Sequence, residues 1–175
     1  TIILHRTLNT TGIGESILSD HLGNLDEMLM GAKLAFLPSP FGVRLRITAI
    51  EKDEAAASRK IEEIERRIRA KAEKYIFSTD EESLEEVIAK LLTTRQLTLA
   101  IAESCTGGLV ADRITNVSGS SKYFERGIVT YSNRSKIELL GGPQSLIDAH
   151  GAVSREVAEA MASGVRAIAK TDIGL

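Results

Sequence analysis

The most constraining feature of the sequence is an apolar run at residues 97–102, followed at once by a polar turn, Glu-Ser-Cys-Thr-Gly-Gly, at residues 103–108. A second apolar stretch begins at Leu109. This order predicts a buried strand, a tight turn and the start of a helix. Glycines at the turn let a ligand approach the backbone, and a helix N-terminus presents free N–H groups. Ligands of α/β proteins bind where strands end in this way, so the turn is a candidate small-molecule site. The alternative is an ordinary strand-to-helix turn in which Ser104 or Thr106 only caps the helix.

Composition limits the classes of protein that fit the sequence. The 175 residues are enough for one large domain or two small ones, and 43% of them are hydrophobic. A single cysteine excludes an internal disulfide and favours a reducing, cytoplasmic location. No apolar run approaches the length that spans a membrane, and no signal peptide is visible. We therefore expect a cytoplasmic protein with no membrane partner.

Charge argues against nucleic acid as the main partner. Residues 1–80 hold 12 basic and 12 acidic side chains, and residues 81–175 hold 10 and 12, so neither part has a basic excess. The charged stretch at residues 62–69 mixes both signs, which is typical of a solvated helix face. Gly12-Ile13-Gly14 lacks the Gly-x-x-Gly spacing with which KH domains clamp RNA. His5 and His21 have no partners at metal-ligand spacing, and both are expected to be structural.

The first part of the chain, residues 1–78, is predicted to be a compact α+β module with the order β-α-β-β-α. Its third strand is the clearest, because Val43, Leu45 and Ile47 alternate with polar residues as in a strand with one wet face. Asp53 is expected to open a long helix. The other expected elements are a strand at 1–8, a helix at 13–22 ended by Gly23-Asn24, a strand at 34–37, a turn at 38–42 and a buried helical stripe of Ile61, Ile64 and Ile68.

The second part, residues 79–175, is predicted to be a layered α/β domain, since strands alternate with helices along it. The expected elements are a capping sequence at 78–82, helices at 84–92, 108–114, 133–140 and 155–168, and strands at 97–102, 123–131 and 172–175. The last segment is expected to join the sheet that contains residues 97–102. The chain starts without Met and stops inside that segment, so we expect a truncated domain from a longer protein.

Five motifs in series resemble the C-terminal domain of the CinA (competence/damage-inducible) family, the nicotinamide mononucleotide deamidases. They lie at residues 102–108, 119–121, 124–127, 130–133 with Lys136, and 150–154. Residues 6–8, 12–16 and 37–40 resemble the KH-like middle domain of the same family. The resemblance implies a KH-like module followed by an incomplete layered α/β deamidase domain. The family's N-terminal domain, similar to molybdopterin-binding domains, is absent, as is a Thr-Gly-Ile-Ala-Gly-Pro loop expected just after Leu175.

The resemblance implies hydrolysis of the nicotinamide carboxamide by a Ser–Lys mechanism, with no cofactor or metal and with a homodimer as the assembly. Ser121 is then the nucleophile and Lys136 the base, with Ser104 and Tyr131 orienting them. The residues implied to bind the substrate are Glu103, Thr106, Gly107, Gly108 and Asn133. The residues themselves add that Ser121 lies in a glycine-containing turn and that Lys136 lies in a first helical turn, where the dipole opposes a cation.

Two alternatives stay open at this point. Cys105 is an intrinsically better nucleophile than a serine, and His150 would be its base. The second alternative is that the chain is a non-catalytic scaffold, in which the two parts mediate assembly. Within the deamidase interpretation, residues 106–108 would bind either the substrate phosphate or its carboxamide oxygen.

Overall fold

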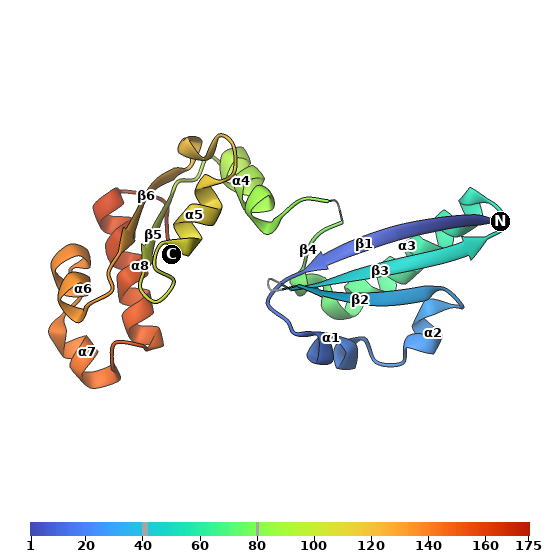
Figure 1. The fold of residues 1–175 in the computed structure, drawn as a ribbon, viewed down its shortest axis with the longest axis horizontal. Coiled ribbons are helices and arrows are strands. Elements are labelled where there is room, and N and C mark those ends of the chain that lie inside the picture. The colour runs from blue at the N-terminus through green and yellow to red at the C-terminus, as the bar shows by residue number, and fades with distance from the viewer. Residues whose placement is uncertain (40–41, 80) are drawn as a thin grey trace. The chain divides into compact units, whose positions relative to one another are not determined.

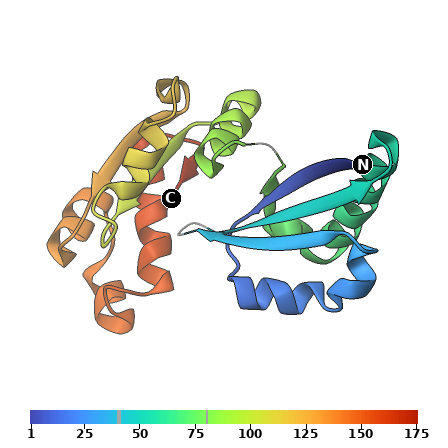
Figure 2. The ribbon, with the colours of Figure 1, turned by 45° about the vertical axis from the view of Figure 1, so that its right-hand side comes forward.

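The computed structural model describes residues 1–39, 42–79 and 81–175 and separates the chain into two compact units, Thr1–Leu84 and Glu85–Leu175. Each unit is a sheet packed against helices (Figures 1 and 2). In the ranges just given, none of the helices has the length and apolar content needed to traverse a lipid bilayer.

The first unit is built on a four-stranded antiparallel sheet with the strand order β2-β3-β1-β4. The strands are β1 (Ile2–Thr10), β2 (Lys33–Ser39), β3 (Gly42–Glu51) and β4 (Ile76–Ser78). The helices are α1 (Glu15–Leu22), α2 (Leu25–Leu29) and α3 (Glu54–Ala72), and a short 3-10 turn, η1 (Glu73–Tyr75), follows α3. All three helices contribute buried side chains to one core on one side of the sheet.

The alternation predicted for β3 is confirmed and explains the two faces of the sheet. Leu45, Ile47 and Ala49 are fully buried, whereas Arg44 and Arg46 between them are exposed. Because successive strand residues point to opposite faces, this pattern buries one face under helices and leaves the other in solvent. The stripe predicted on the long helix is also confirmed, since Ile61, Ile64 and Ile68 of α3 are buried. Asp53 caps α3, its carboxylate accepting the N–H of Ala56 at 2.8 Å.

Two short elements of the first unit were not predicted. Gly23-Asn24 ends α1 as expected, but the Asn24 side chain then accepts the N–H groups of Asp26 and Glu27 and starts α2. Strand β4 pairs with the end of β1 through Asn9 and Ser78. The predicted turn at 38–42 includes Pro40 and Phe41, and the predicted capping sequence at 78–82 includes Asp80; these three residues lie outside the described part of the chain.

The second unit is a three-stranded parallel sheet with the order β6-β5-β7 and helices on both faces (Figure 1). The strands are β5 (Leu99–Glu103), β6 (Phe124–Val129) and β7 (Ile173–Gly174). The helices are α4 (Leu84–Arg95), α5 (Leu109–Thr115), α6 (Asn133–Leu140), α7 (Gln144–His150) and α8 (Arg155–Ala169), with the 3-10 turn η2 (Ser120–Lys122) before β6.

Central strand β5 is buried on both faces, which explains its continuous apolar sequence. Leu99 and Ile101 pack into a core with residues of α4 and α5. Ala100 packs into a second core with residues of α6, α7 and α8. A single strand therefore supports two helical layers, which is the layered α/β arrangement that the sequence predicted.

Strand β7 lies beside β5, as predicted for residues 172–175. Its register pairs Leu99 with Ile173 and Ala100 with Gly174. The Asp172 carboxylate accepts hydrogen bonds from the N–H and the hydroxyl of Thr98, both at 2.8 Å. These bonds fix the start of β7 to the start of β5. Helix α7 was not predicted, and Leu91 and Leu139, which were expected on apolar faces, are 47% and 49% exposed.

Candidate active site

The candidate site lies at the carboxyl end of β5, in the turn of residues 104–108 between that strand and α5. Gly107 and Gly108 both have positive φ, 63° and 105°, which explains why this turn needs glycine. The Cβ that a larger residue would add at Gly108 would also lie 3.7 Å from the Val129 side chain on β6. That distance is an ordinary van der Waals contact, so the backbone conformation, and not lack of space, is what calls for glycine here.

Glu103 has a role in this turn that the sequence did not indicate. Its side chain is only 3% exposed, and its carboxylate accepts the N–H groups of Gly108, Val110 and Ala111 at 3.0, 3.1 and 2.8 Å. Burial favours a raised pKa, but hydrogen bonds from Ala111, from the Thr106 side chain and from the other two N–H groups outweigh it and hold the pKa of Glu103 below its ordinary value of 4.5.

This carboxylate occupies the N-terminus of α5. The three N–H groups that a substrate phosphate or carboxamide would use at this helix are already bound to Glu103. Of residues 106–108, for which the sequence left phosphate and carboxamide binding open, Gly107 and Gly108 have their N–H groups bound within the turn. The Glu103 oxygens also have their hydrogen-bond partners inside the turn, so the structure gives this carboxylate a structural role there.

We expect Glu103→Gln to destabilise the second unit by about 1–3 kcal/mol, since it weakens charged hydrogen bonds in a buried place. The folded-state pKa of Glu103 is lowered, so its contribution is present above the pKa of the unfolded carboxyl group and is lost as the pH falls below it. Urea unfolding between pH 7 and pH 3 measures both effects, and the variant is expected to lose less stability than the natural chain on acidification. Glu138→Gln, at an exposed position, is the control; equal losses in the two variants would contradict this role of Glu103.

Lys136 is the second component of the site. It lies in the first turn of α6, which begins with Ser132 as its cap, the Ser132 hydroxyl accepting the N–H of Ser135 at 3.1 Å. Its side chain crosses to β5, and only 4% of the residue is exposed. The Nζ atom donates to the Ser104 hydroxyl at 3.1 Å and to the carbonyl oxygens of Thr130 and Tyr131 at 2.9 and 3.4 Å. Lys136 is thus a buried amine that is hydrogen-bonded to a serine hydroxyl, with no carboxylate among these partners.

Two residues near Lys136 were missed by the sequence reasoning: Thr130, which binds its amine, and Gly164, which lies against the last residue of α6. Thr130 is fully buried, supplies the nearest carbonyl to Nζ, and donates its own N–H to the Glu103 carbonyl at 2.7 Å. Gly164 of α8 touches the end of α6, since a Cβ there would lie 2.2 Å from the Leu140 carbonyl oxygen. A glycine inside an otherwise good helical pattern was the available signal for such a close approach.

The strand order does not bring Ser121 and Lys136 together, although the sequence analysis paired them. Ser121 lies in η2, before β6, whereas Lys136 lies in α6, after β6. Strands β5 and β6 are parallel, with Leu99 opposite Phe124 and Glu103 opposite Val129. The steps from the first to the last of the six residues of β6 cover roughly 16 Å at about 3.3 Å per step, so Ser121 lies at the amino edge of the sheet and Ser104 and Lys136 lie at its carboxyl edge.

The other predicted residues lie around Ser104 with different contacts. The Thr106 hydroxyl bonds to the Glu103 carboxylate. Tyr131 is 78% exposed, and its main-chain carbonyl accepts a hydrogen bond from Lys136. Asn133 is the exposed first residue of α6. Only Ser104, Lys136 and the main chain of Tyr131 are joined by hydrogen bonds among the residues predicted to be catalytic, and this holds within the described part of the chain.

The alternative pair, Cys105 and His150, is not assembled. Cys105 is exposed in the turn after β5, and the His150 ring lies at the end of α7 with its Nδ1 3.9 Å from a Glu156 carboxylate oxygen. Neither shares a hydrogen bond with the other over residues 81–175. Within the described ranges, moreover, no three His, Cys, Asp or Glu side chains gather in a way that could hold a metal ion.

Comparisons with known proteins agree with this architecture. Residues 5–78 match the damage-inducible protein CinA KH domain, and residues 81–175 match the CinA C-terminal domain. A CinA-like protein of Syntrophus aciditrophicus is 47% identical over 170 residues, covering 97% of this chain and 40% of its own. A putative competence-damage inducible protein of Moorella thermoacetica is 48% identical over 174 residues, covering 99% of this chain and 42% of its own.

A solved structure resembles part of the chain. The crystal structure of a competence-damaged protein (CinA) superfamily protein from Escherichia coli matches with a TM-score of 0.50 and 34% identity, over 51% of this chain and 52% of that one. The chain spans about two fifths of the length of the Syntrophus and Moorella proteins, and the regions aligned with them include both of its units. On this evidence, the chain belongs to the CinA family.

Proposed function

We propose that the second unit is an amidohydrolase that converts nicotinamide mononucleotide to nicotinate mononucleotide and ammonia, with Ser104 as the nucleophile and Lys136 as the base. The observation that carries the proposal is the 3.1 Å hydrogen bond between Lys136 Nζ and Ser104 Oγ, made by an amine that is almost fully buried. A serine gains nucleophilicity when a base removes its proton, and Ser–Lys pairs perform this task in other hydrolases. The substrate is inferred from the family resemblance.

The reaction can be written with the residues present. In its neutral form Lys136 takes the Ser104 proton as Oγ attacks the carboxamide carbon, and a tetrahedral oxyanion forms. Lys136 then returns that proton to the departing nitrogen, which leaves as ammonia, and an acyl ester remains on Ser104. A water molecule, deprotonated by the same amine, attacks the ester carbon; the Oγ–C bond breaks, Lys136 returns the proton to Ser104 Oγ, and the acid leaves and ionises to the carboxylate. One base serves both the formation and the hydrolysis of the acyl ester, which requires only that Nζ of Lys136 stay near Oγ of Ser104.

The turn also offers donors for the oxyanion. Glu103 takes the N–H groups of Gly108, Val110 and Ala111, and carbonyls of the turn itself take those of Gly107 and Leu109. In the described part of the chain, the N–H groups of Cys105 and Thr106 are left without an acceptor. They directly follow the nucleophile, which is where an oxyanion formed on an acyl group attached to Ser104 would find main-chain donors.

The proposal is tested by measuring ammonia release from nicotinamide mononucleotide by the purified chain, with nicotinate mononucleotide identified by chromatography. Nicotinamide riboside and asparagine are the comparison substrates: the first lacks the phosphate and the second carries an unrelated carboxamide. We expect turnover of the mononucleotide and little or none of asparagine. Absence of ammonia from all three would contradict the proposed function for this chain.

A further inference from the structure

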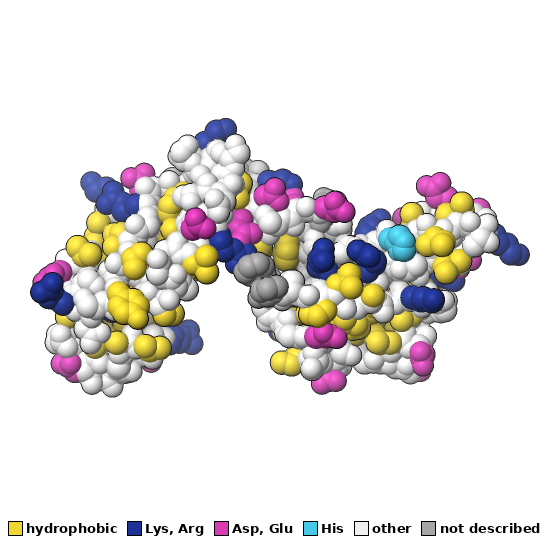
Figure 3. Space-filling view, in the orientation of Figure 1, with side chains coloured by type: hydrophobic (Ala, Val, Ile, Leu, Met, Phe, Trp, Pro, Cys, Tyr) yellow, Lys and Arg dark blue, Asp and Glu magenta, His cyan; other side chains and the backbone are white. Residues whose placement is uncertain are grey.

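The sheet of the first unit has one face without a helix over it. Side chains at alternate positions of β1, β2 and β3 share this face, because the residues between them point into the core. The registers place Thr7 opposite Arg46 and Asn9 opposite Arg44. Figure 3 shows basic side chains and a histidine gathered over these strands. The members with positive or titratable side chains are His5, Lys33, Arg44 and Arg46.

This positive face exists although residues 1–80 carry no net charge. Two acidic residues of α3 are paired within the helix, where Glu63 binds Arg66 and Arg67, and Glu65 binds Arg69. Arg6, which belongs to β1, also pairs with Glu65, at 2.8 Å. The folding of the chain therefore separates charges that the composition balances.

Arg44 and Arg46 are exposed, and within the described residues neither has a carboxylate partner. They are two residues apart on one strand, so their side chains leave the same face about 6.6–6.8 Å apart. Two guanidinium groups at this spacing can bind one phosphate together, since each offers a planar pair of N–H donors. Holding two like charges side by side without a counter-ion also favours an anion between them.

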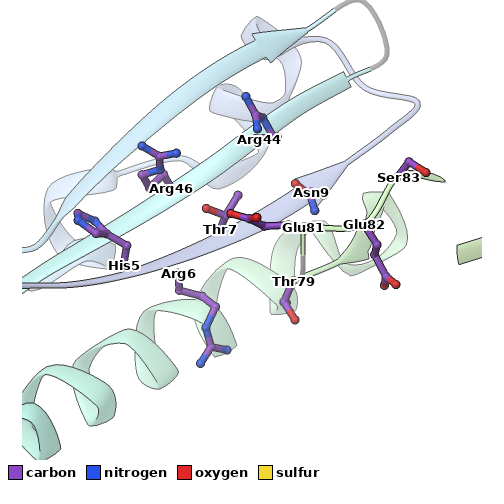
Figure 4. A pocket seen from close by; sticks show the side chains of 10 residues that line it. All are labelled: His5, Arg6, Thr7, Asn9, Arg44, Arg46, Thr79, Glu81, Glu82 and Ser83. Atoms are coloured by element: carbon purple, nitrogen blue, oxygen red, sulfur yellow. The ribbon is translucent and has the colours of Figure 1, made fainter. Parts of the chain in front are cut away.

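A cavity of about 890 Å³ lies over these arginines, between the sheet and the side chains of Thr79, Glu81, Glu82 and Ser83 (Figure 4). Thr7 and Asn9 form part of its floor, and the carboxylates of Glu81 and Glu82 lie on another side. The volume is that of a small-molecule site. Its lining combines donors for a phosphate with carboxylates and a hydroxyl, which are the groups that bind the hydroxyls of a sugar.

We propose that this cavity binds a phosphorylated sugar, with its phosphate on Arg44 and Arg46 and its hydroxyls on Glu81 and Thr7. A nucleic acid strand fits the lining less well, because no Phe, Tyr or Trp is among the described residues that line the cavity, and because the two carboxylates repel a continuous polyanion. The site lies wholly in the first unit and does not depend on the function proposed for the second.

The test is calorimetric titration of the whole chain with ribose 5-phosphate at low ionic strength. The double variant Arg44→Gln/Arg46→Gln is expected to weaken binding by at least about tenfold, because it removes both phosphate donors. Arg59→Gln makes the same substitution at an exposed arginine of α3 and is expected to change nothing. Ser104→Ala is expected to leave binding intact, which separates this site from the candidate active site. Circular dichroism of each variant verifies folding.

Glu81→Gln is expected to change the preference of the cavity between two probes. Removing this carboxylate should raise the affinity for inorganic phosphate, which it repels. It should lower the ratio of the affinity for ribose 5-phosphate to the affinity for phosphate, because a partner of the sugar hydroxyls is lost. Ribose alone is expected not to bind. The proposal is overturned if ribose 5-phosphate shows no binding at millimolar concentration, or if the double arginine variant binds it normally. It is also overturned if a single-stranded RNA binds more tightly, with an affinity that falls steeply with salt.

Discussion

Replacement of Ser104 by Ala is expected to lower the rate of carboxamide hydrolysis by roughly a thousandfold or more, while the chain stays folded. The hydroxyl lies 3.1 Å from the buried amine, and alanine leaves the amine with its two carbonyl partners, so the change removes chemistry rather than packing. The measurement is kcat for ammonia release from nicotinamide mononucleotide, together with the thermal midpoint of unfolding.

Ser121→Ala is the matched control. It removes the same atom from an exposed serine at the amino edge of the sheet, and we expect it to keep activity within about twofold, as for a surface change. The reverse result, an inactive Ser121→Ala and an active Ser104→Ala, would show that the nucleophile is Ser121, as the family resemblance implied, and not Ser104.

Lys136→Met is expected to abolish turnover as completely as Ser104→Ala, because the serine loses its base. Methionine has a similar length and an apolar end, so it can fill a buried position while leaving two carbonyls without their donor. The double variant Ser104→Ala/Lys136→Met is expected to be no slower than either single variant, since the two groups act as a unit. The three rates, measured in one ammonia assay, test this non-additivity.

Lys136→Arg distinguishes a base from a fixed positive charge. A guanidinium keeps the charge but does not give up its proton in proteins, so an arginine can orient the serine without activating it. We expect this variant to be inactive. Substantial activity in Lys136→Arg, or a double variant much slower than both single variants, would contradict the role of Lys136 as base.

Much of the fold follows from residue patterns that have one physical meaning. The alternation from Val43 to Ala49 fits only a strand with one buried face, and the spacing of Ile61, Ile64 and Ile68 fits only a helix. Asp53 sits at the N-cap predicted for it, because its carboxylate carries an oxygen for the free N–H groups of a first turn. Even the last segment, with its two-residue strand β7, lies where an apolar stretch after a helix should lie.

The missed elements are those for which short-range patterns are weak. Helix α2 has five residues and α7 has seven, too few for a helical period to emerge. Strand β4 has three residues and is fixed by its pairing with β1, which local sequence does not report. The buried role of Glu103 was also hidden, since a carboxylate at a strand end is equally compatible with a ligand site.

The error over Ser121 has a different origin. The predicted strand at residues 123–131 already separated Ser121 from Lys136, one before it and one after it. In a parallel sheet this order places the two residues at opposite edges, so the predicted elements themselves argued against the pairing. The role of Ser121 as nucleophile rested on the family resemblance alone. Ser104 and Lys136, by contrast, each follow the carboxyl end of a neighbouring parallel strand, where such sites are built.

The Glu103 carboxylate gives the turn after β5 its own internal anion. A helix terminus that is left open in a free enzyme attracts whatever oxyanion the buffer supplies, and its loop changes shape as that ion comes and goes. Here the counter-charge is covalently part of the chain, one residue before Ser104, the proposed nucleophile. The turn should therefore keep one shape whether the site is empty or filled, and its position should be insensitive to sulfate or phosphate in solution.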